Sequence, residues 1–278
     1  MALENITPFD AVVPLHPKDL EVLPYCIYGL RKNTRGLRNI YVISKDDPEE
    51  DAIWVPEASF SFSLADVASI IQSTNGREGW YFQQLLKLYT FRTIPDILPH
   101  VLLFDADCIM CRPVEFFQDG KILFDWSEKQ GHEAYFTHAR AIMGDLFQHV
   151  DPEKSGITDN MMVHRPIMES LLQKIETRGK MLPAWRIFLE AVKPELRNLS
   201  GMSEYEIYYN YALTWFAEQH GLRELKRGMG TSFRALTEGS GDAHIIAIHN
   251  WLVNLYKSQI ESSKSGGVTS DEKDSATL

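Results

Sequence analysis

The chain of 278 residues contains little cysteine: only Cys26, Cys108 and Cys111. Three thiols cannot all pair within one chain, and a chain of this length does not depend on disulfides to fold, so we expect a reducing compartment. The sequence also lacks a run approaching the ~20 apolar residues of a membrane span, and its N-terminus lacks the basic and apolar segments of a signal peptide. These absences predict a cytoplasmic protein without a membrane span, or a chain trimmed of an anchor.

Positive charge is also scarce, because 28 Lys and Arg face 38 Asp and Glu, for a formal net charge of −10. Nucleic-acid binding needs clustered Lys and Arg on the phosphates, so that class of partner is excluded. An anionic substrate would have to be bound at a local site, through a metal ion. The 44% hydrophobic content is enough for a substantial core, and we expect one domain over residues 1–260 followed by a disordered polar tail over 261–278.

Short apolar runs alternate with helical patterns along the chain. Buried strands are expected at residues 10–15, 39–44, 100–104, 157–164 and 243–251, and helices at 20–31, 79–89, 166–176 and 203–213. Residues 133–138 and 157–164 are candidate walls of a site. Such alternation predicts an α/β domain with a mixed, mostly parallel sheet flanked by helices.

The strand at 100–104 stops abruptly at Asp105-Ala106-Asp107. Open α/β sheets bind ligands at the carboxyl ends of their strands, and two carboxylates there can hold one divalent cation against a diphosphate. A triplet of this kind also occurs as a solvated turn or a helix cap. The apolar residues on both sides of this triplet favour the metal site.

Residues 101–113, Val-Leu-Leu-Phe-Asp-Ala-Asp-Cys-Ile-Met-Cys-Arg-Pro, resemble the Asp-X-Asp signature of GT-A glycosyltransferases. Residues 79–87 resemble the donor-side helix of a soluble subgroup from bacteria and large algal DNA viruses, and the likeness extends through 10–15 and 203–206 to most of 8–255. It implies a Rossmann-like GT-A fold and Mn²⁺ or Mg²⁺. It also implies transfer from a UDP- or GDP-sugar, for example UDP-xylose, to a glycan or glycoprotein; some viral members glycosylate their own capsid proteins.

The resemblance assigns the metal ligands. Asp107 would be the main ligand, and Asp105 would bind the metal through water or bind the ribose of the donor. His249 would be the third ligand; it could instead be a structural histidine packed by Trp251, and His244 is a weaker candidate for the same role.

The resemblance also implies a set of donor-binding residues: Val13, Pro14, Arg77, Gln84, Lys87, Asp105 and Ala106. Val13 and Pro14 would lie against the nucleobase, with Lys18 or Asp19 nearby, unless this is an ordinary strand-to-helix loop. Arg77 and Lys87 would meet the diphosphate and Gln84 the sugar. The alternative for Lys87 is a solvated charge on a helix.

A carboxylate is expected to deprotonate the acceptor hydroxyl, because an inverting transfer proceeds by a single displacement. Glu204, at the start of the helix capped by Ser203, is the first candidate, Asp159 the second and Glu206 the third. A carboxylate at a helix start could equally serve the helix dipole alone.

Other readings are a sugar-nucleotide nucleotidyltransferase and a non-catalytic carbohydrate-binding protein that uses the aromatic residues. The first is disfavoured because this chain lacks, after its first strand, the Gly-rich, basic loop with which such enzymes hold a triphosphate. The second predicts sugar binding that needs neither nucleotide nor metal. Cys108 and Cys111 have the spacing of a redox or zinc motif, but the chain has no second cysteine pair to complete a zinc site. The sequence leaves the oligomeric state open.

Overall fold

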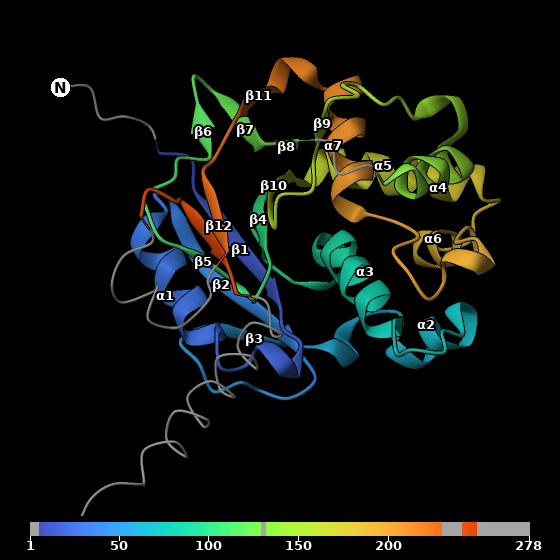
Figure 1. The fold of residues 1–278 in the computed structure, drawn as a ribbon, viewed down its shortest axis with the longest axis horizontal. Helices are drawn as coiled ribbons and strands as arrows, with labels where there is room; N and C mark the ends of the chain where they lie inside the picture. Colours follow the sequence, from blue (N-terminus) through green and yellow to red (C-terminus); the bar gives the residue numbers. More distant parts are fainter. Residues whose placement is uncertain (1–5, 129–131, 230–240, 249–278) are drawn as a thin grey trace, which may run out of the picture.

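The computed structural model describes residues 6–128, 132–229 and 241–248. Its main sheet has the strand order β10-β4-β1-β2-β3 (Figure 1). The strands are β1 (Phe9–Pro14), β2 (Leu37–Ser44), β3 (Ile53–Pro56), β4 (His100–Phe104) and β10 (Asn160–His164). Strands β4, β1, β2 and β3 run parallel to one another, and β10 runs antiparallel to β4. The expected mixed, mostly parallel sheet is confirmed.

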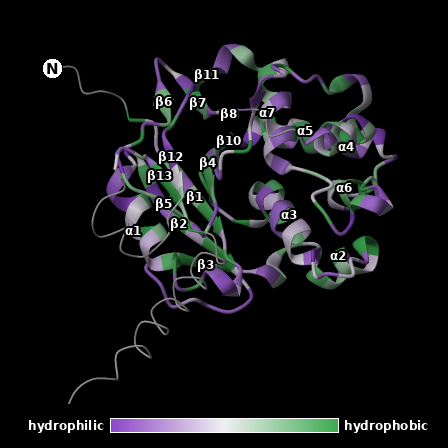
Figure 2. Cartoon of the chain, in the orientation of Figure 1, coloured by the Kyte–Doolittle hydropathy of each residue, from purple (hydrophilic) through white to green (hydrophobic). Residues whose placement is uncertain are grey.

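The centre of this sheet is apolar because helices cover both of its faces. All residues of β1 are buried, and hydrophobic residues run along the main sheet in Figure 2. Helix α1 lies on one side of the sheet and α3 on the other (Figure 1). The helices are α1 (Leu23–Asn33), α2 (Leu64–Ile71), α3 (Glu78–Thr93), α4 (Glu133–Met143), α5 (Arg165–Arg178), α6 (Ala184–Glu190) and α7 (Glu204–Trp215).

Smaller sheets extend the domain beside the main one. They have the orders β12-β13-β5, β11-β7-β6 and β8-β9. Their strands are β5 (Cys108–Met110), β6 (Phe117–Gln118), β7 (Lys121–Asp125), β8 (Ser127–Glu128), β9 (Lys154–Ser155), β11 (His220–Arg223), β12 (Arg227–Met229) and β13 (Ile245–Ala247). Since β5 follows the Asp-Ala-Asp turn directly and pairs with β13, the end of the described chain returns to this turn.

The sequence located most elements and missed some of their boundaries. The strand at 100–104 is confirmed in full. The helix expected at 20–31 is instead α1 at Leu23–Asn33, since Pro24 fits only the first turn of a helix. Residues 133–138, left without an assignment, open helix α4.

Two sequence predictions fall partly or wholly outside the described residues. The strand expected at 243–251 is described as far as Ile248 and contains β13, while the tail at 261–278 is not described. In the described part of the chain, no helix is both long and apolar enough to cross a membrane.

Candidate functional site

Asp105, Ala106 and Asp107 form a tight turn between β4 and β5. The Asp105 amide donates to the Asp159 carbonyl (3.0 Å), and the Cys108 amide donates to the Asp105 carbonyl (3.0 Å). The first of these bonds ties the turn to the start of β10. Both aspartates therefore sit at the carboxyl end of β4, as the sequence predicted, with Ala106 buried between them.

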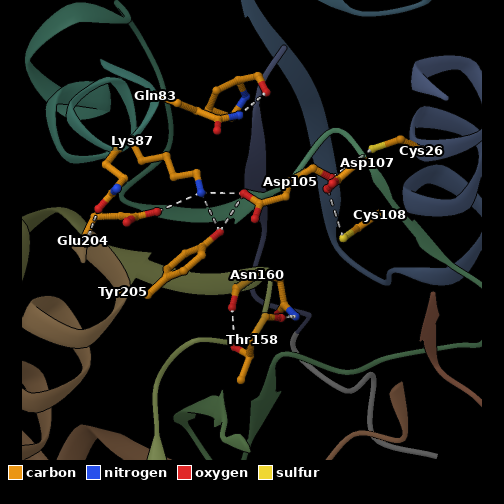
Figure 3. Close-up of polar contacts among 12 residues, drawn as sticks. Cys26, Gln83, Lys87, Asp105, Asp107, Cys108, Thr158, Asn160, Glu204 and Tyr205 are labelled. Atoms are coloured by element: carbon orange, nitrogen blue, oxygen red, sulfur yellow. Dashed lines mark hydrogen bonds and ion pairs between the residues drawn. The ribbon is translucent and has the colours of Figure 1, made fainter. Parts of the chain in front are cut away.

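Lys87 of α3 lies at the centre of a polar cluster beside this turn (Figure 3). Its Nζ donates to Asp105 Oδ1 (2.5 Å), to Glu204 Oε1 (2.8 Å) and to the Tyr205 hydroxyl (3.1 Å). The Tyr205 hydroxyl also donates to Asp105 Oδ1 (3.2 Å). One ammonium thus joins the β4 turn to the first turn of α7.

The charge of Lys87 is held inside the protein. Its side chain is only 3% exposed, so the alternative of a solvated helix charge is wrong. Burial works against the ammonium, but Asp105 and Glu204 outweigh it and raise the pKa of Lys87 well above its ordinary value. Losing either carboxylate would leave this cation partly uncompensated.

Helix α3 also contacts β1 and α7 through consecutive glutamines. Gln83 Nε2 donates to the Pro14 carbonyl (3.2 Å), and Gln84 Oε1 accepts from the Glu204 amide (3.2 Å). Gln84 is buried, and its Nε2 has no hydrogen-bond partner in the described part of the protein. A buried donor without a partner is costly.

The other residues predicted to bind the sugar donor lie at the end of β1 (Val13 and Pro14) and just before α3 (Arg77). Val13 and Pro14 are buried. Their predicted contact with the nucleobase stays a prediction. Arg77 precedes Lys87 by ten residues, or about 15 Å of helix. Its guanidinium donates to the Leu199 carbonyl (3.1 Å) and to Ser200 Oγ (2.7 Å), which ties it to the loop before α7.

Asp159 has the most unusual environment among the site carboxylates. It adopts a left-handed backbone, with φ of 55°, which is uncommon outside glycine and concentrates at functional sites. Burial and the neighbouring Asp105 raise the pKa of Asp159 to about 6, against the opposing pull of Arg227. Arg227 Nη1 lies 3.7 Å from Asp159 Oδ2, too far for a hydrogen bond.

Glu204 and Glu206 both lie in the first turn of α7, which begins as predicted after Ser203. The Ser203 hydroxyl accepts from the Glu206 amide. Glu204 is 5% exposed and bonded to Lys87, whereas Glu206 is 2% exposed and bonded to Ser155 and Asn210. Neither carboxylate is exposed to an acceptor, and the role of Glu204 as a base stays a prediction.

The predicted metal site is only partly described. Asp105 and Asp107 supply the hard oxygen ligands that Mn²⁺ and Mg²⁺ prefer, and both lie on one turn. Within residues 6–128, 132–229 and 241–248, no group of three or more His, Cys, Asp or Glu residues could hold a metal ion. His249 lies outside the described residues, and His244 Nδ1 instead accepts from the Lys226 amide (3.2 Å).

Charge around the turn favours a cation. Four carboxylates gather there and only two basic side chains accompany them: Asp105, Asp107, Asp159 and Glu204 against Lys87 and Arg227. A divalent ion would offset the excess negative charge. Asp105 and Asp107 therefore offer two carboxylate ligands to the predicted metal, and the metal itself stays a prediction.

Sequence reasoning missed several residues of the site. Helical spacing in the sequence favours a core position for Tyr205, although its hydroxyl contacts both Lys87 and Asp105. Arg227 follows a polar segment with no motif, so only its position beside Asp159 reveals it. Cys26 gave no signal either, yet its thiol lies 4.0 Å from the Asp105 carbonyl.

Comparisons with known proteins give one family. The profile of the Family of unknown function (DUF6492) matches residues 38–227. No curated protein matches the chain. Among solved structures, the chain is similar to mouse xyloside xylosyltransferase 1 in its apo form, with a TM-score of 0.46, 10% identity, and coverage of 88% of this chain and 98% of that one. A similarity this low carries no argument about activity.

Proposed function

We propose that this chain, which belongs to the family of unknown function DUF6492, is a metal-dependent glycosyltransferase of the GT-A type that uses a nucleoside-diphosphate sugar. The observation that carries the proposal is the turn Asp105-Ala106-Asp107 at the carboxyl end of β4, with the buried ammonium of Lys87 bonded to its first aspartate. Ligands of α/β sheets bind at this end of the strands, and a diphosphate needs positive charge there.

Asp105 and Asp107 are the proposed holders of the cation. Bound Mn²⁺ or Mg²⁺ would supply positive charge to the donor diphosphate and so make the nucleotide a better leaving group. Lys87 adds a fixed positive charge on the α3 side. Because its three N–H donors are taken by Asp105, Glu204 and Tyr205, its proposed role is to hold Asp105 in place beside the cation.

The sugar and the acceptor are proposed to bind beside the Asp105–Asp107 turn. Gln84 is the proposed donor of a hydrogen bond to the sugar, supported by its buried Nε2 without a protein partner. The acceptor is a hydroxyl of a glycan or glycoprotein. UDP-sugars, UDP-xylose among them, are the first donors to test.

Asp159 is the proposed acceptor of the proton from the attacking hydroxyl, in a transfer with inversion. A general base works best with a pKa near the working pH, and the pKa of Asp159, about 6, fits that role. Glu204 is less suited because Lys87 already compensates its charge. A product with retained anomeric configuration would remove Asp159 from this role.

Turnover tests the proposal. The chain is incubated with Mn²⁺ and a panel of UDP- and GDP-sugars, and the released nucleotide and the anomer of the product are measured. We expect turnover with at least one donor, and loss of it on chelation and in Asp107→Asn. Asp119→Asn is the matched control, an exposed carboxylate in the β6–β7 turn that accommodates asparagine at the same positive φ.

The two rival functions give different results in the same assay. A nucleotidyltransferase would release pyrophosphate from a nucleoside triphosphate and a sugar phosphate instead of releasing UDP or GDP. A carbohydrate-binding protein would retain sugar after chelation and would turn over no donor. Either result would contradict the proposal.

A further inference from the structure

Asp159 lies in a short segment, residues 158–160, in which the two flanking residues are hydrogen-bonded to each other. The Thr158 hydroxyl donates to the Asn160 carbonyl (2.8 Å), and Asn160 Nδ2 donates to the Thr158 carbonyl (2.8 Å), as Figure 3 shows. These two bonds close around Asp159 and maintain its left-handed backbone. They fix the backbone conformation of Asp159, but they do not fix the position of residues 158–160 relative to the rest of the site.

The residues just before this segment are held against α7 by Glu206. The Glu206 carboxylate accepts hydrogen bonds from the Ser155 hydroxyl and from Asn210 Nδ2. Ser155 Oγ in turn accepts from the Ile157 amide (3.2 Å). A continuous chain of bonds thus leads from α7 to within two residues of Asp159.

Close packing reinforces these bonds. A Cβ built at Gly156 would lie 2.5 Å from Tyr209 Cβ, so only glycine allows the segment to approach α7 so closely. On the far side, the carbonyl of Asp159 accepts from the Asp105 amide. The position of Asp159 relative to Asp105 therefore depends on how residues 155–156 sit on α7.

Stability alone does not account for Glu206. The carboxylate is buried and its hydrogen-bond partners, Ser155 and Asn210, are neutral, so burial raises its pKa against the pull of those hydrogen bonds. Buried charges without a cation are expensive, and apolar replacements of equal volume are often neutral or stabilising. A costly group that accepts a bond from this segment, and joins it to Asn210 of α7, suits a role in fixing geometry.

We propose that Glu206 is a positioning residue: by anchoring Ser155 to α7, it places the Asp159 carboxylate at the Asp105 turn for reaction. This inference rests on the proposed function for its catalytic consequence. It takes Glu206 out of the candidates for the base, because its carboxylate acts through the segment rather than on the substrate.

The test compares Ser155→Ala and Glu206→Gln with Tyr211→Phe. The control removes a partly buried hydrogen bond of the same helix, between the Tyr211 hydroxyl and Ser170 Oγ on α5, and leaves residues 155–160 untouched. Ser155→Ala removes a single hydroxyl and serves if Glu206→Gln fails to fold. Hydrogen exchange at the amides of residues 156–160 and turnover of the donor are measured for each variant.

In Ser155→Ala and Glu206→Gln, we expect exchange at residues 156–160 to rise about fivefold or more, as for the loss of one hydrogen bond. We expect kcat to fall about tenfold to a hundredfold while the donor KM stays within about twofold, because misplacement affects reaction more than binding. Tyr211→Phe should change neither quantity by more than about twofold.

Two results would overturn the inference: unchanged exchange at residues 156–160 in both variants, or faster exchange with an unchanged kcat. Failure of the proposed function is a separate outcome, since the wild type would then turn over no donor. Even then the exchange data would decide whether Glu206 anchors the segment.

Discussion

The two sides of the candidate site differ in how well their charges are satisfied. On the α3 side, Lys87 is bonded to Asp105, Glu204 and Tyr205 in an almost closed network. On the β10 side, Asp159 faces Arg227 at 3.7 Å, and Arg227 Nε and Nη1 have no hydrogen-bond partner among the described residues. A satisfied network resists movement, whereas an unsatisfied one can exchange partners with a substrate. We expect the first side to fix geometry and the second to take part in chemistry.

The largest effect is expected from a substitution that removes the central cation of the satisfied α3 side. Lys87→Met leaves Asp105 and Glu204 next to each other without their cation, and removing one partner of a buried ion pair costs about 3–5 kcal/mol. Urea unfolding should show this loss, while Lys121→Met, at an exposed lysine, should leave stability within about 0.5 kcal/mol. Adding Glu204→Gln to Lys87→Met should recover part of the loss. Equal stability of Lys87→Met and the wild type would show that the network is not formed.

A smaller effect is expected from Tyr205→Phe. The change removes one hydroxyl that accepts from Lys87 and donates to Asp105, and leaves the ion pairs in place. The expected loss is about 1–2 kcal/mol, the usual range for a buried hydrogen-bonding group. Thermal unfolding measures it. A loss as large as that of Lys87→Met would mean that the tyrosine, and not the charges, holds the α3 side together.

The smallest effect on stability is expected at Asp159, because its side chain is 37% exposed and solvent screens its charge, and the effect has the opposite sign. The folded pKa of Asp159, about 6, lies above the ordinary 3.8, so the folded protein binds its proton more tightly and loses stability as pH rises from about 4 to 6. Asp159→Asn removes that cost. The variant should melt slightly above the wild type at pH 7.5, and the difference should vanish as the pH is lowered to 4.

The same variant separates stability from activity. If Asp159 accepts the proton, Asp159→Asn should lower kcat about 10²- to 10⁴-fold at pH 7.5 while the fold is retained. If Asp159→Asn is less stable than the wild type at pH 7.5, the interactions of Asp159 are satisfied in the folded protein, as those of Lys87 are. A variant that keeps its kcat would remove it from the chemistry.

The sequence predicted the sheet well because buried parallel strands appear as short apolar runs. Strand β4 and the turn after it follow directly from that pattern, and the cap at Ser203 follows from a serine at the start of a helical pattern. Helix α4 was missed because residues 133–138 mix aromatic and polar side chains without a clear period.

The partners across the site could not be predicted from local patterns. Lys87 and Glu204 are 117 residues apart, and nothing in either segment indicates that they meet. The left-handed backbone of Asp159 and its approach to Arg227 likewise result from tertiary packing. Types of residue at the ends of strands are visible in a sequence, whereas the pairing of charges between distant elements is not.

The central claim is that the Asp105–Asp107 turn binds a nucleotide together with a metal. Thermal unfolding with UDP or GDP, with and without Mn²⁺, tests it for the wild type and Asp107→Ala. We predict that one nucleotide raises the melting temperature of the wild type only when Mn²⁺ is present, and that Asp107→Ala abolishes the shift. A wild type that no nucleotide stabilises in a metal-dependent way would contradict the account.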